Sequence, residues 1–269
     1  LAHEVCKELR LLNINARSIV NKSDQLEAII LGYAPHIVVI TETWLHEAID
    51  DTVVFPPSYR AFRRDRNTRG GGVTILVKDD IPVVLLRQPE NIECVTLKVT
   101  CWNISLLVFG LYRPPDSSPQ FLHDLCEHMS SFSHDKIFLV GDFNLPEIDW
   151  VNEYPGPDLN TNSNYISNIM LYHNLRQVVN QPTRVHGTSA TVLDLVFVSQ
   201  TISDFSVSVE PGISDHHMVY FSCPIQSCSI NPCKRVTVKD FSRARDESVL
   251  DFLDFSLNSF HGDDVISLW

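Results

Sequence analysis

The sequence predicts a layered α/β domain, because apolar strands of the buried type alternate with amphipathic helices along most of the chain. Residues 137–140 form an apolar run with branched and aromatic side chains, which is typical of a central strand buried on both faces. A second run of this kind, residues 36–40, follows a segment with apolar residues at helical spacing. A chain of 269 residues with 44% apolar content can bury the core of one large domain.

Composition limits the classes of partner. The formal net charge of -12 and the isoelectric point near 5.3 argue against broad, nonspecific attraction to polyanions. If the partner is nucleic acid, binding has to rely on a local basic face and on metal ions that offset an acidic site. The seven cysteines form no CxxC pair, which indicates reduced thiols in an intracellular protein. No apolar run is as long as a membrane span and no signal peptide opens the chain, so we expect no membrane partner.

The first two predicted strands both end in polar side chains. Residues 9–14 lead into Asn13 and Asn15, which the alternation of a strand places on the same side. A predicted helix separates this strand from residues 36–40, which run directly toward Glu42. A second buried strand therefore ends in a carboxylate.

An arginine-rich segment, residues 59–69, precedes three consecutive glycines, residues 70–72, and a predicted strand over residues 73–77. The glycines are not followed by a helix or by a Gly-Lys-Ser/Thr sequence, so we do not interpret them as a phosphate-binding P-loop. Two interpretations of the arginines remain open here. The segment is either a solvated hairpin or an edge that contacts phosphate, with Arg63 and Arg64 as the candidate contacts.

Residues 93–99 and 104–112 predict an antiparallel pair joined by a turn. The second strand ends at Tyr112, just before two prolines. The helix predicted after these prolines carries His123 and His128, which we expect at the protein surface.

The central strand ends in Asp142 and Asn144. Polar side chains at the end of a buried strand are costly unless they have a use. Both residues are also ordinary turn formers, so a turn and a catalytic role remain open at this point. Residues 145–164 are rich in Pro, Asn and Asp and predict a long surface loop, followed by a helix over residues 165–175.

The last part of the core contains a carboxylate inside an apolar run. Asp194 lies within the predicted strand 192–198, and a buried acid of this kind is expected to have a partner such as an imidazole. Asp215 and His216 precede the last strand, residues 218–221. Considered alone, His216 reads as a surface histidine and Asp215 as a turn acid.

The regular pattern ends after this strand. We expect residues 1–225 to form one domain, and residues 226–269 to be a linker and the start of a following unit.

The segments LNIN, TETW, GLYRPP, GDFN, LDLVF and SDHH, considered together, resemble the endonuclease/exonuclease/phosphatase family, which includes DNase I-like nucleases and apurinic endonucleases. Matching segments extend over residues 9–221. The segments YRPP, GDFN, QPTR and LDLVF are similar to the apurinic-endonuclease-like endonuclease domain of LINE-type, non-LTR retrotransposons. The resemblance implies a four-layer α/β/β/α sandwich of two mixed β-sheets.

The resemblance also implies a hydrolytic site that uses Mg²⁺, or Mn²⁺ in its place. Such an oxygen-rich site suits a hard cation. Glu42 is the implied principal metal ligand, with Asn13 and Asp215 in the metal shell. The implied catalytic residues are Glu42, Tyr112, Asp142, Asn144, Asp194 and His216. The implied supporting residues are Asn15, Thr183 and Ser214.

Each implied role is specific. Asp142 orients or deprotonates the attacking water, and Asn144 fixes that water or the phosphate. His216 contacts the scissile phosphate while Asp194 holds its ring, and Tyr112 donates to a phosphate oxygen. Whether Asp142 or His216 is the general base stays open.

By resemblance, this is an intracellular, metal-dependent endodeoxyribonuclease that acts in the nucleus. It is expected to nick double-stranded DNA and to leave a 3′ hydroxyl, which primes reverse transcription by a reverse transcriptase domain of the same polypeptide. The alternatives are an abasic-site endonuclease, another phosphoesterase, or a catalytically decayed copy that only binds nucleic acid. The region that forms a DNA-contacting hairpin in related nucleases, residues 185–191, is short, so we expect relaxed specificity governed by how easily the duplex deforms.

Overall fold

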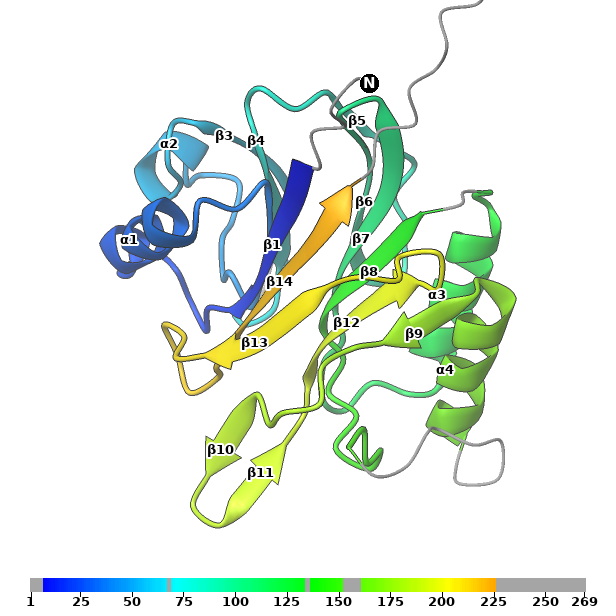
Figure 1. The fold of residues 1–269 in the computed structure, drawn as a ribbon. Helices are drawn as coiled ribbons and strands as arrows, with labels where there is room; N and C mark the ends of the chain where they lie inside the picture. Colours follow the sequence, from blue (N-terminus) through cyan, green and yellow to red (C-terminus); the bar gives the residue numbers. More distant parts are fainter. Residues whose placement is uncertain (1–6, 67–68, 134–135, 152–160, 226–269) are drawn as a thin grey trace, which may run out of the picture. The chain divides into compact units, whose positions relative to one another are not determined.

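Two six-stranded β-sheets form the centre of the protein (Figure 1). The structure, a computed structural model, describes residues 7–66, 69–133, 136–151 and 161–225, all within one compact unit, Leu1–Cys228. In strand order, the first sheet contains β13 (Ser206–Glu210), β14 (Met218–Ile225), β1 (Lys7–Asn15), β2 (Ile37–Thr41), β4 (Val73–Lys78) and β3 (Tyr59–Arg64). The second contains β5 (Val83–Leu85), β6 (Glu93–Cys101), β7 (Ile104–Tyr112), β8 (Ile137–Asp142), β12 (Asp194–Ser199) and β9 (Leu175–Gln177).

Helices cover the outer face of each sheet. The first sheet carries α1 (Ser23–Tyr33) and α2 (Asp51–Val54), and the second carries α3 (Gln120–Ser130) and α4 (Thr161–Tyr172), as Figure 1 shows. A hairpin of β10 (Arg184–His186) and β11 (Ser189–Thr191) projects from the sheets. The predicted four-layer α/β/β/α sandwich is therefore confirmed.

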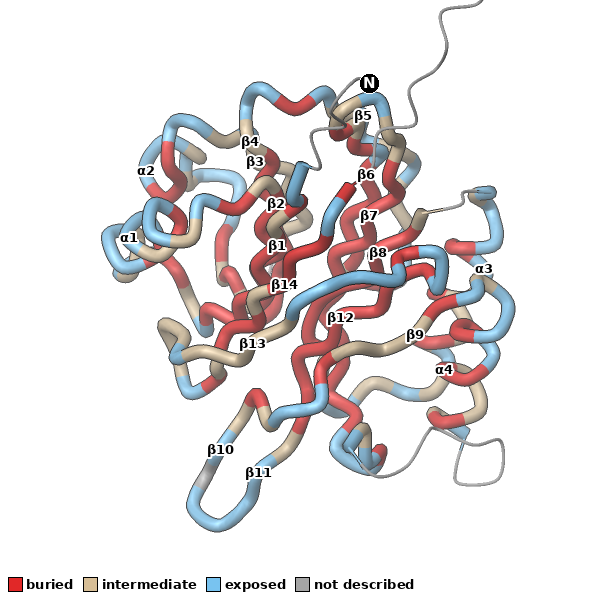
Figure 2. The backbone as a smooth tube through the Cα atoms, in the orientation of Figure 1, coloured by how far each residue is buried: buried red, intermediate tan, exposed pale blue. Residues whose placement is uncertain are grey.

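Alternation along the strands of the first sheet divides the core into two parts. On β2, Val39 packs between the two sheets, whereas Val38 packs toward the side where Leu26 of α1 is buried. The sheets approach closely, because a Cβ atom on Gly110 would lie 2.8 Å from Ile75 of the opposite sheet. Figure 2 shows that the buried backbone follows the strands of both sheets, while the β10–β11 hairpin is largely exposed. The packed sheets thus form a firm base for residues at the strand ends.

Several short elements were not predicted. The edge strands β5, β9 and β13 have only three to five residues, too few to show an alternating pattern. The helix expected over residues 165–175 is α4, which ends at Tyr172, and Leu175 starts β9. The predictions for residues 226–269, and part of the loop expected at 145–164, lie outside the described residues.

The expectation that His128 lies at the surface is wrong. Its side chain is 9% exposed, its Nε2 atom lies 2.8 Å from Thr96 Oγ1, and its ring contacts Phe109 and Phe132 edge to face. Burial, helped by the charges of Arg87 and Arg64, lowers the pKa of His128 to about 4. His123, on the same helix, lies at the surface in part, as expected.

This buried histidine predicts a loss of stability in mild acid. The folded-state pKa lies below the ordinary value of 6.5, so the unfolded chain binds the proton more tightly and stability falls as pH drops from about 6.5 to about 4. The loss is at most about 3 kcal/mol. His128→Gln keeps a hydrogen-bond partner for Thr96. It should flatten the plot of unfolding free energy against pH over this range, measured by urea unfolding, whereas His123→Gln should not. Parallel curves for His128→Gln and the wild type would contradict the prediction.

Candidate active site

Tyr112 and Asp142 end β7 and β8, and Asp194 starts the neighbouring antiparallel strand β12. Tyr112 pairs with Asp142 across the parallel β7–β8 ladder, and Asp142 pairs with Asp194 across the antiparallel β8–β12 ladder. All three side chains are buried. Residues that are far apart in the sequence therefore form one row at a single end of this sheet.

Gly141 and Asn144 set the backbone around Asp142. Gly141 has a φ of 150°, and a Cβ atom there would lie 1.8 Å from the Leu111 carbonyl oxygen, so only glycine fits. Asn144 has a φ of 45°, and its backbone N–H donates to Asp142 Oδ1 at 3.1 Å. The polar end of the central strand is thus a specific turn that holds one carboxylate oxygen.

Asn15 connects the first sheet to this carboxylate. Its Nδ2 atom donates to Asp142 Oδ2 at 2.8 Å in the interior. Ser214 Oγ donates to the Asn15 carbonyl at 2.6 Å and accepts from the His216 N–H at 3.1 Å. Ser214 therefore fixes the loop of His216 against the end of β1.

His216 and Asp194 form a buried pair. His216 Nδ1 lies 2.8 Å from Asp194 Oδ2. Thr183 Oγ1 accepts from the N–H groups of Leu193 and Asp194 at 3.0 Å, which fixes the backbone of the acid. Burial alone would lower the pKa of His216, but the hydrogen bond and charge of Asp194, with the charge of Asp142, raise it above the usual value. The site favours the positively charged imidazolium.

Burial and the nearby charge of Asp194 raise the pKa of Asp142 well above its usual range. The charge of His216 and the hydrogen bonds from Asn144 and Asn15 oppose this shift only in part. Two buried carboxylates and one imidazole leave an excess of negative charge. Such a site suits a bound cation or a proton-accepting role.

Glu42 approaches the row from the first sheet. Its Oε1 atom accepts from the Tyr112 hydroxyl at 2.7 Å, and its Oε2 atom accepts from Trp44 Nε1 at 3.2 Å. Burial, together with this hydrogen bond and the charge of Glu42, raises the pKa of Tyr112, which therefore stays a proton donor. Glu42 itself is only half-buried and has a φ of 50°, in the left-handed region.

The other two predicted metal ligands differ in their surroundings. Asn13 is fully buried; its Nδ2 atom donates to the Gly141 and Leu195 carbonyls at 3.3 and 3.5 Å, while its Oδ1 atom has no partner. Asp215 forms ion pairs with Arg17 at 3.0 Å and Arg184 at 3.1 Å. Partial burial of Asp215 favours its neutral form, but these arginines outweigh that effect and hold its pKa below the usual range.

Comparison with known proteins shows which proteins this chain resembles. Residues 106–220 match the family model described as endonuclease-reverse transcriptase. The match spans less than half of the 269 residues and shows what this part of the chain is similar to. This confirms the resemblance recognised in the sequence motifs. No curated protein sequence matches the chain.

Solved structures share the fold of this chain at low sequence identity. The endonuclease domain of TRAS1, a telomere-specific non-LTR retrotransposon, has a TM-score of 0.63 at 17% identity, and the match covers 81% of this chain and 99% of that one. The AP endonuclease LMAP from Leishmania major has a TM-score of 0.60 at 13% identity, covering 81% and 88%. An AP endonuclease from Archaeoglobus fulgidus has a TM-score of 0.58 at 14% identity, covering 81% and 99%.

The donor atoms at the strand ends fit a hard cation. The described residues include a buried group, Asp142, Asp194 and His216, whose ligand atoms lie within 4.8 Å of one another. However, Asp194 and His216 are hydrogen-bonded to each other, and imidazole is a poor ligand for Mg²⁺. Glu42 is more open, and Asn13 Oδ1 is a buried oxygen without a partner. We therefore keep the predicted ligands and treat the buried group as catalytic.

Side chains that were predicted to contact phosphate or water have partners within the protein. The guanidinium of Arg63 is paired with Asp51 at 2.7 Å and with Asp65, and donates to two backbone carbonyls, so it cannot reach a phosphate without breaking these bonds. We therefore withdraw Arg63 from the proposed phosphate contacts. Arg64 donates to the Glu90 carbonyl at 2.7 Å from an exposed position and remains a candidate. Asn144 donates its side-chain N–H to the Arg113 carbonyl at 2.7 Å, so its amide nitrogen is committed to the backbone.

Sequence reasoning missed three arginines near the site. Arg113 is 2% exposed and donates to the Asn144 carbonyl at 2.9 Å and to the Ser117 carbonyl at 2.7 Å, which fixes the turn behind Asp142. The prolines that follow it were interpreted only as the end of a strand. The partners of Asp215 were missed as well: Arg17 follows β1, and Arg184, the last residue of the QPTR segment, starts β10.

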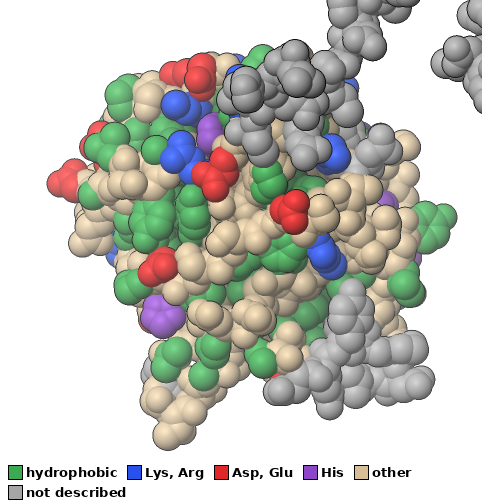
Figure 3. Space-filling model, viewed as in Figure 1, with side chains coloured by type: hydrophobic (Ala, Val, Ile, Leu, Met, Phe, Trp, Pro, Cys, Tyr) green, Lys and Arg blue, Asp and Glu red, His purple; other side chains and the backbone are tan. Residues whose placement is uncertain are grey.

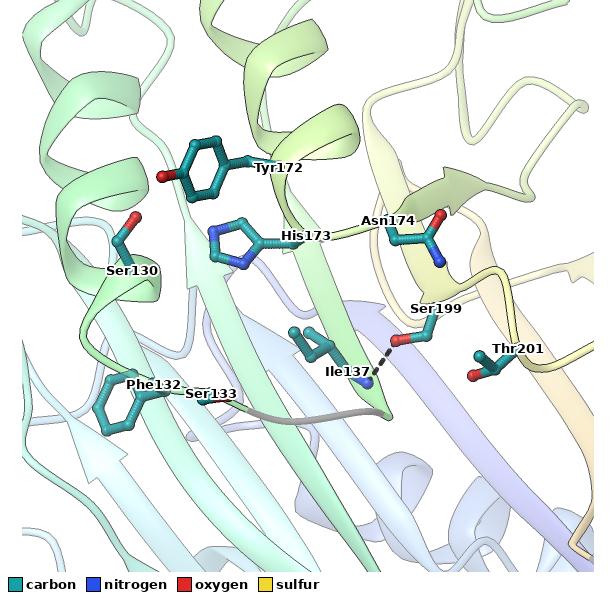
Figure 4. A pocket seen from close by; sticks show the side chains of 9 residues that line it. All are labelled: Ser130, Phe132, Ser133, Ile137, Tyr172, His173, Asn174, Ser199 and Thr201. Atoms are coloured by element: carbon teal, nitrogen blue, oxygen red, sulfur yellow. Dashed lines mark hydrogen bonds between the residues drawn. The ribbon is translucent and has the colours of Figure 1, made fainter.

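A cavity of about 580 Å³ lies away from the site (Figure 4). Its lining includes Ile137 and Ser199, joined by a hydrogen bond of 2.8 Å. Ile137 starts β8 and Ser199 ends β12, whereas Asp142 ends β8 and Asp194 starts β12. The cavity is therefore at the opposite end of the second sheet from Tyr112, Asp142 and Asp194.

Proposed function

We propose that this domain is a Mg²⁺-dependent nuclease that hydrolyses one strand of double-stranded DNA and leaves a 3′ hydroxyl. One observation carries the proposal, which is that hydrogen bonds join the two sheets beside the Asp194–His216 pair. Glu42 is hydrogen-bonded to Tyr112, and Asn15 to Asp142. Buried groups with shifted pKa values that converge in this way are typical of a reaction site.

Glu42, with Asn13 and Asp215, would hold Mg²⁺, or Mn²⁺ in its place. When bound, the ion supplies positive charge that polarises the phosphoryl oxygen and offsets the charge on the departing 3′ oxygen. Asp215 would have to exchange its arginine partners to take part.

The residues of the chain supply the remaining chemistry. Asp142, with its raised pKa, is suited to accept a proton from the attacking water. His216, held positively charged by Asp194, would donate to a phosphate oxygen in the transition state. Tyr112 would donate to another oxygen. Asn144 would act mainly by fixing the turn that carries Asp142.

DNA binding would rely on a few local basic groups. On the face shown in Figure 3, Lys and Arg side chains are scattered among Asp and Glu side chains and form no continuous basic area. Arg17 and Arg184 are 56% and 38% exposed beside the site, and would transfer from Asp215 to the phosphates that flank the scissile bond. Arg64 would contact phosphate farther away.

The matching family model and the TRAS1 domain suggest the biological setting. The 3′ hydroxyl would prime reverse transcription by a polymerase domain of the same polypeptide, acting on DNA in the nucleus. In the described part of the chain, no helix has the length and apolar character needed to cross a membrane.

The test compares Glu42→Gln with Glu47→Gln, which changes an exposed glutamate in the same loop. Supercoiled plasmid and Mg²⁺ should give open circles with the wild type and Glu47→Gln, while Glu42→Gln should be slower by at least about a hundredfold. A DNA polymerase should extend the nicks directly, because they end in a 3′ hydroxyl. Full nicking by Glu42→Gln would refute the assignment.

Abasic-site cleavage is the second candidate, supported by the structural likeness to AP endonucleases. A duplex with one abasic analogue, cut much faster than the intact duplex, would favour it. Salt-sensitive DNA binding without turnover would indicate a decayed copy.

A further inference from the structure

The three consecutive glycines, residues 70–72, have no part in the chemistry above, yet their backbone is unusual. Gly70, Gly71 and Gly72 have φ values of 87°, 71° and 87°, where other residues are strained. Around Gly70 there is open space, whereas a Cβ atom on Gly71 or Gly72 would lie within 2.7 Å of neighbouring atoms. Two of these glycines are therefore required by what packs against them.

The neighbour of Gly72 is the segment that carries Glu42. The Trp44 N–H donates to the Gly71 carbonyl at 3.0 Å, and the Thr43 N–H approaches the Gly72 carbonyl at 3.4 Å. A Cβ atom on Gly72 would lie 2.6 Å from Thr43 Oγ1, a buried atom without a partner. Because Glu42 and Trp44 both have positive φ values, 50° and 55°, contacts of this kind have to hold them in place.

The Arg66–Glu93 ion pair links Gly72 to Tyr112, whose hydroxyl is hydrogen-bonded to Glu42. Glu93 accepts from the Gly72 N–H at 2.6 Å and from Arg66 Nε at 2.6 Å. The Arg66 guanidinium lies 5.7 Å from the centre of the Tyr112 ring, and Tyr112 is opposite Glu93 in the β6–β7 ladder. Since the Tyr112 hydroxyl donates to Glu42, this carboxylate is held from two sides, through Gly72 and Thr43 and through Arg66 and Tyr112.

We propose that Gly72, Arg66 and Glu93 are positioning residues, which fix the Glu42 carboxylate in the orientation that receives the divalent cation. They act through Thr43 and Tyr112. The inference rests on the proposed function, because it takes Glu42 as the principal ligand. Residues behind a metal ligand commonly change metal affinity by roughly ten- to a hundredfold when they are mutated.

The chain provides a matched control. Gly70 and Gly72 have the same φ of 87°, but only Gly72 is crowded, so Gly70→Ala carries the backbone strain without the collision. Mn²⁺ binding to the full chain, without DNA, can be measured by electron paramagnetic resonance. Gly72→Ala should raise the dissociation constant about tenfold or more, and Gly70→Ala should stay within about twofold of the wild type. Thermal unfolding would show that both variants fold.

A second substitution separates positioning from general damage. Adding Thr43→Ala to Gly72→Ala removes the colliding oxygen and should restore most of the Mn²⁺ affinity. Glu93→Gln, which keeps the Gly72 contact and weakens the Arg66 pair, should give an intermediate loss and keeps the test valid if Gly72→Ala does not fold. Equal affinities for Glu93→Gln, Gly72→Ala and Gly70→Ala would overturn the positioning role alone. A wild-type chain that binds no Mn²⁺ would overturn the metal site of the proposed function as well.

Discussion

Replacing Asp142 with Asn is expected to lower the rate of plasmid nicking by roughly a thousandfold and to leave the domain at least as stable as the wild type. The loss of rate follows because an amide cannot accept a proton from water. Stability is retained because the ionised carboxylate is disfavoured by its burial and by Asp194. For a raised carboxyl pKa, this cost is full above the folded-state pKa, shrinks as pH falls below it, and is absent below the unfolded-state pKa.

Single-turnover nicking and thermal unfolding in EDTA measure the two parts of this prediction separately. Asp116→Asn, at an exposed position, is the control and should change neither. A variant that unfolds several degrees lower and still nicks at the wild-type rate would show that Asp142 is a structural carboxylate.

The Asp194–His216 pair is expected to behave as one unit. Asp194→Asn and His216→Asn should each lower the nicking rate by about a thousandfold, and the double variant should be little worse than either, because residues of one catalytic unit are strongly non-additive. The 2.8 Å contact and the low exposure of both side chains are the physical basis. A double-mutant cycle in single-turnover nicking measures the coupling.

His217→Asn is the control for this cycle, because His217 is adjacent in sequence and contributes a backbone N–H to the Thr183 carbonyl at 2.7 Å. Its rate should stay close to that of the wild type. Losses that simply multiply in the double variant, to about a millionfold, would mean that the two residues act independently.

The sequence predicted the sheet core well, because buried strands have a clear local signature. The runs around Val39 and Val140 are confirmed as central strands, and the polar residues after them lie at the strand ends. What local patterns do not contain is the pairing of strands. That Asp142 lies between Tyr112 and Asp194 depends on β7–β8 and β8–β12 ladders, which join segments far apart in the chain.

Local sequence does not show which side chains have partners elsewhere in the fold. His128 is buried because Thr96 and Phe109 of the second sheet meet its ring, and nothing on its own helix indicates this. Arg63, for which the sequence left a solvated hairpin and a phosphate contact open, is paired with Asp51 and Asp65. The motif resemblance was the stronger guide to the site, since it matches spacing across the whole fold.

The β10–β11 hairpin is attached at its base to residues of the proposed active site. The Thr183 N–H donates to the Thr191 carbonyl at 2.9 Å, and the backbone of Arg184 forms an antiparallel β-bridge with that of His216. Farther along the hairpin, the Val185 side chain is 51% exposed. A chimaera that borrows this loop from another nuclease should therefore be spliced within residues 185–190. Grafts cut outside these limits would disturb the Asp194 and Asp215 contacts, and altered target choice would then be confounded with impaired turnover.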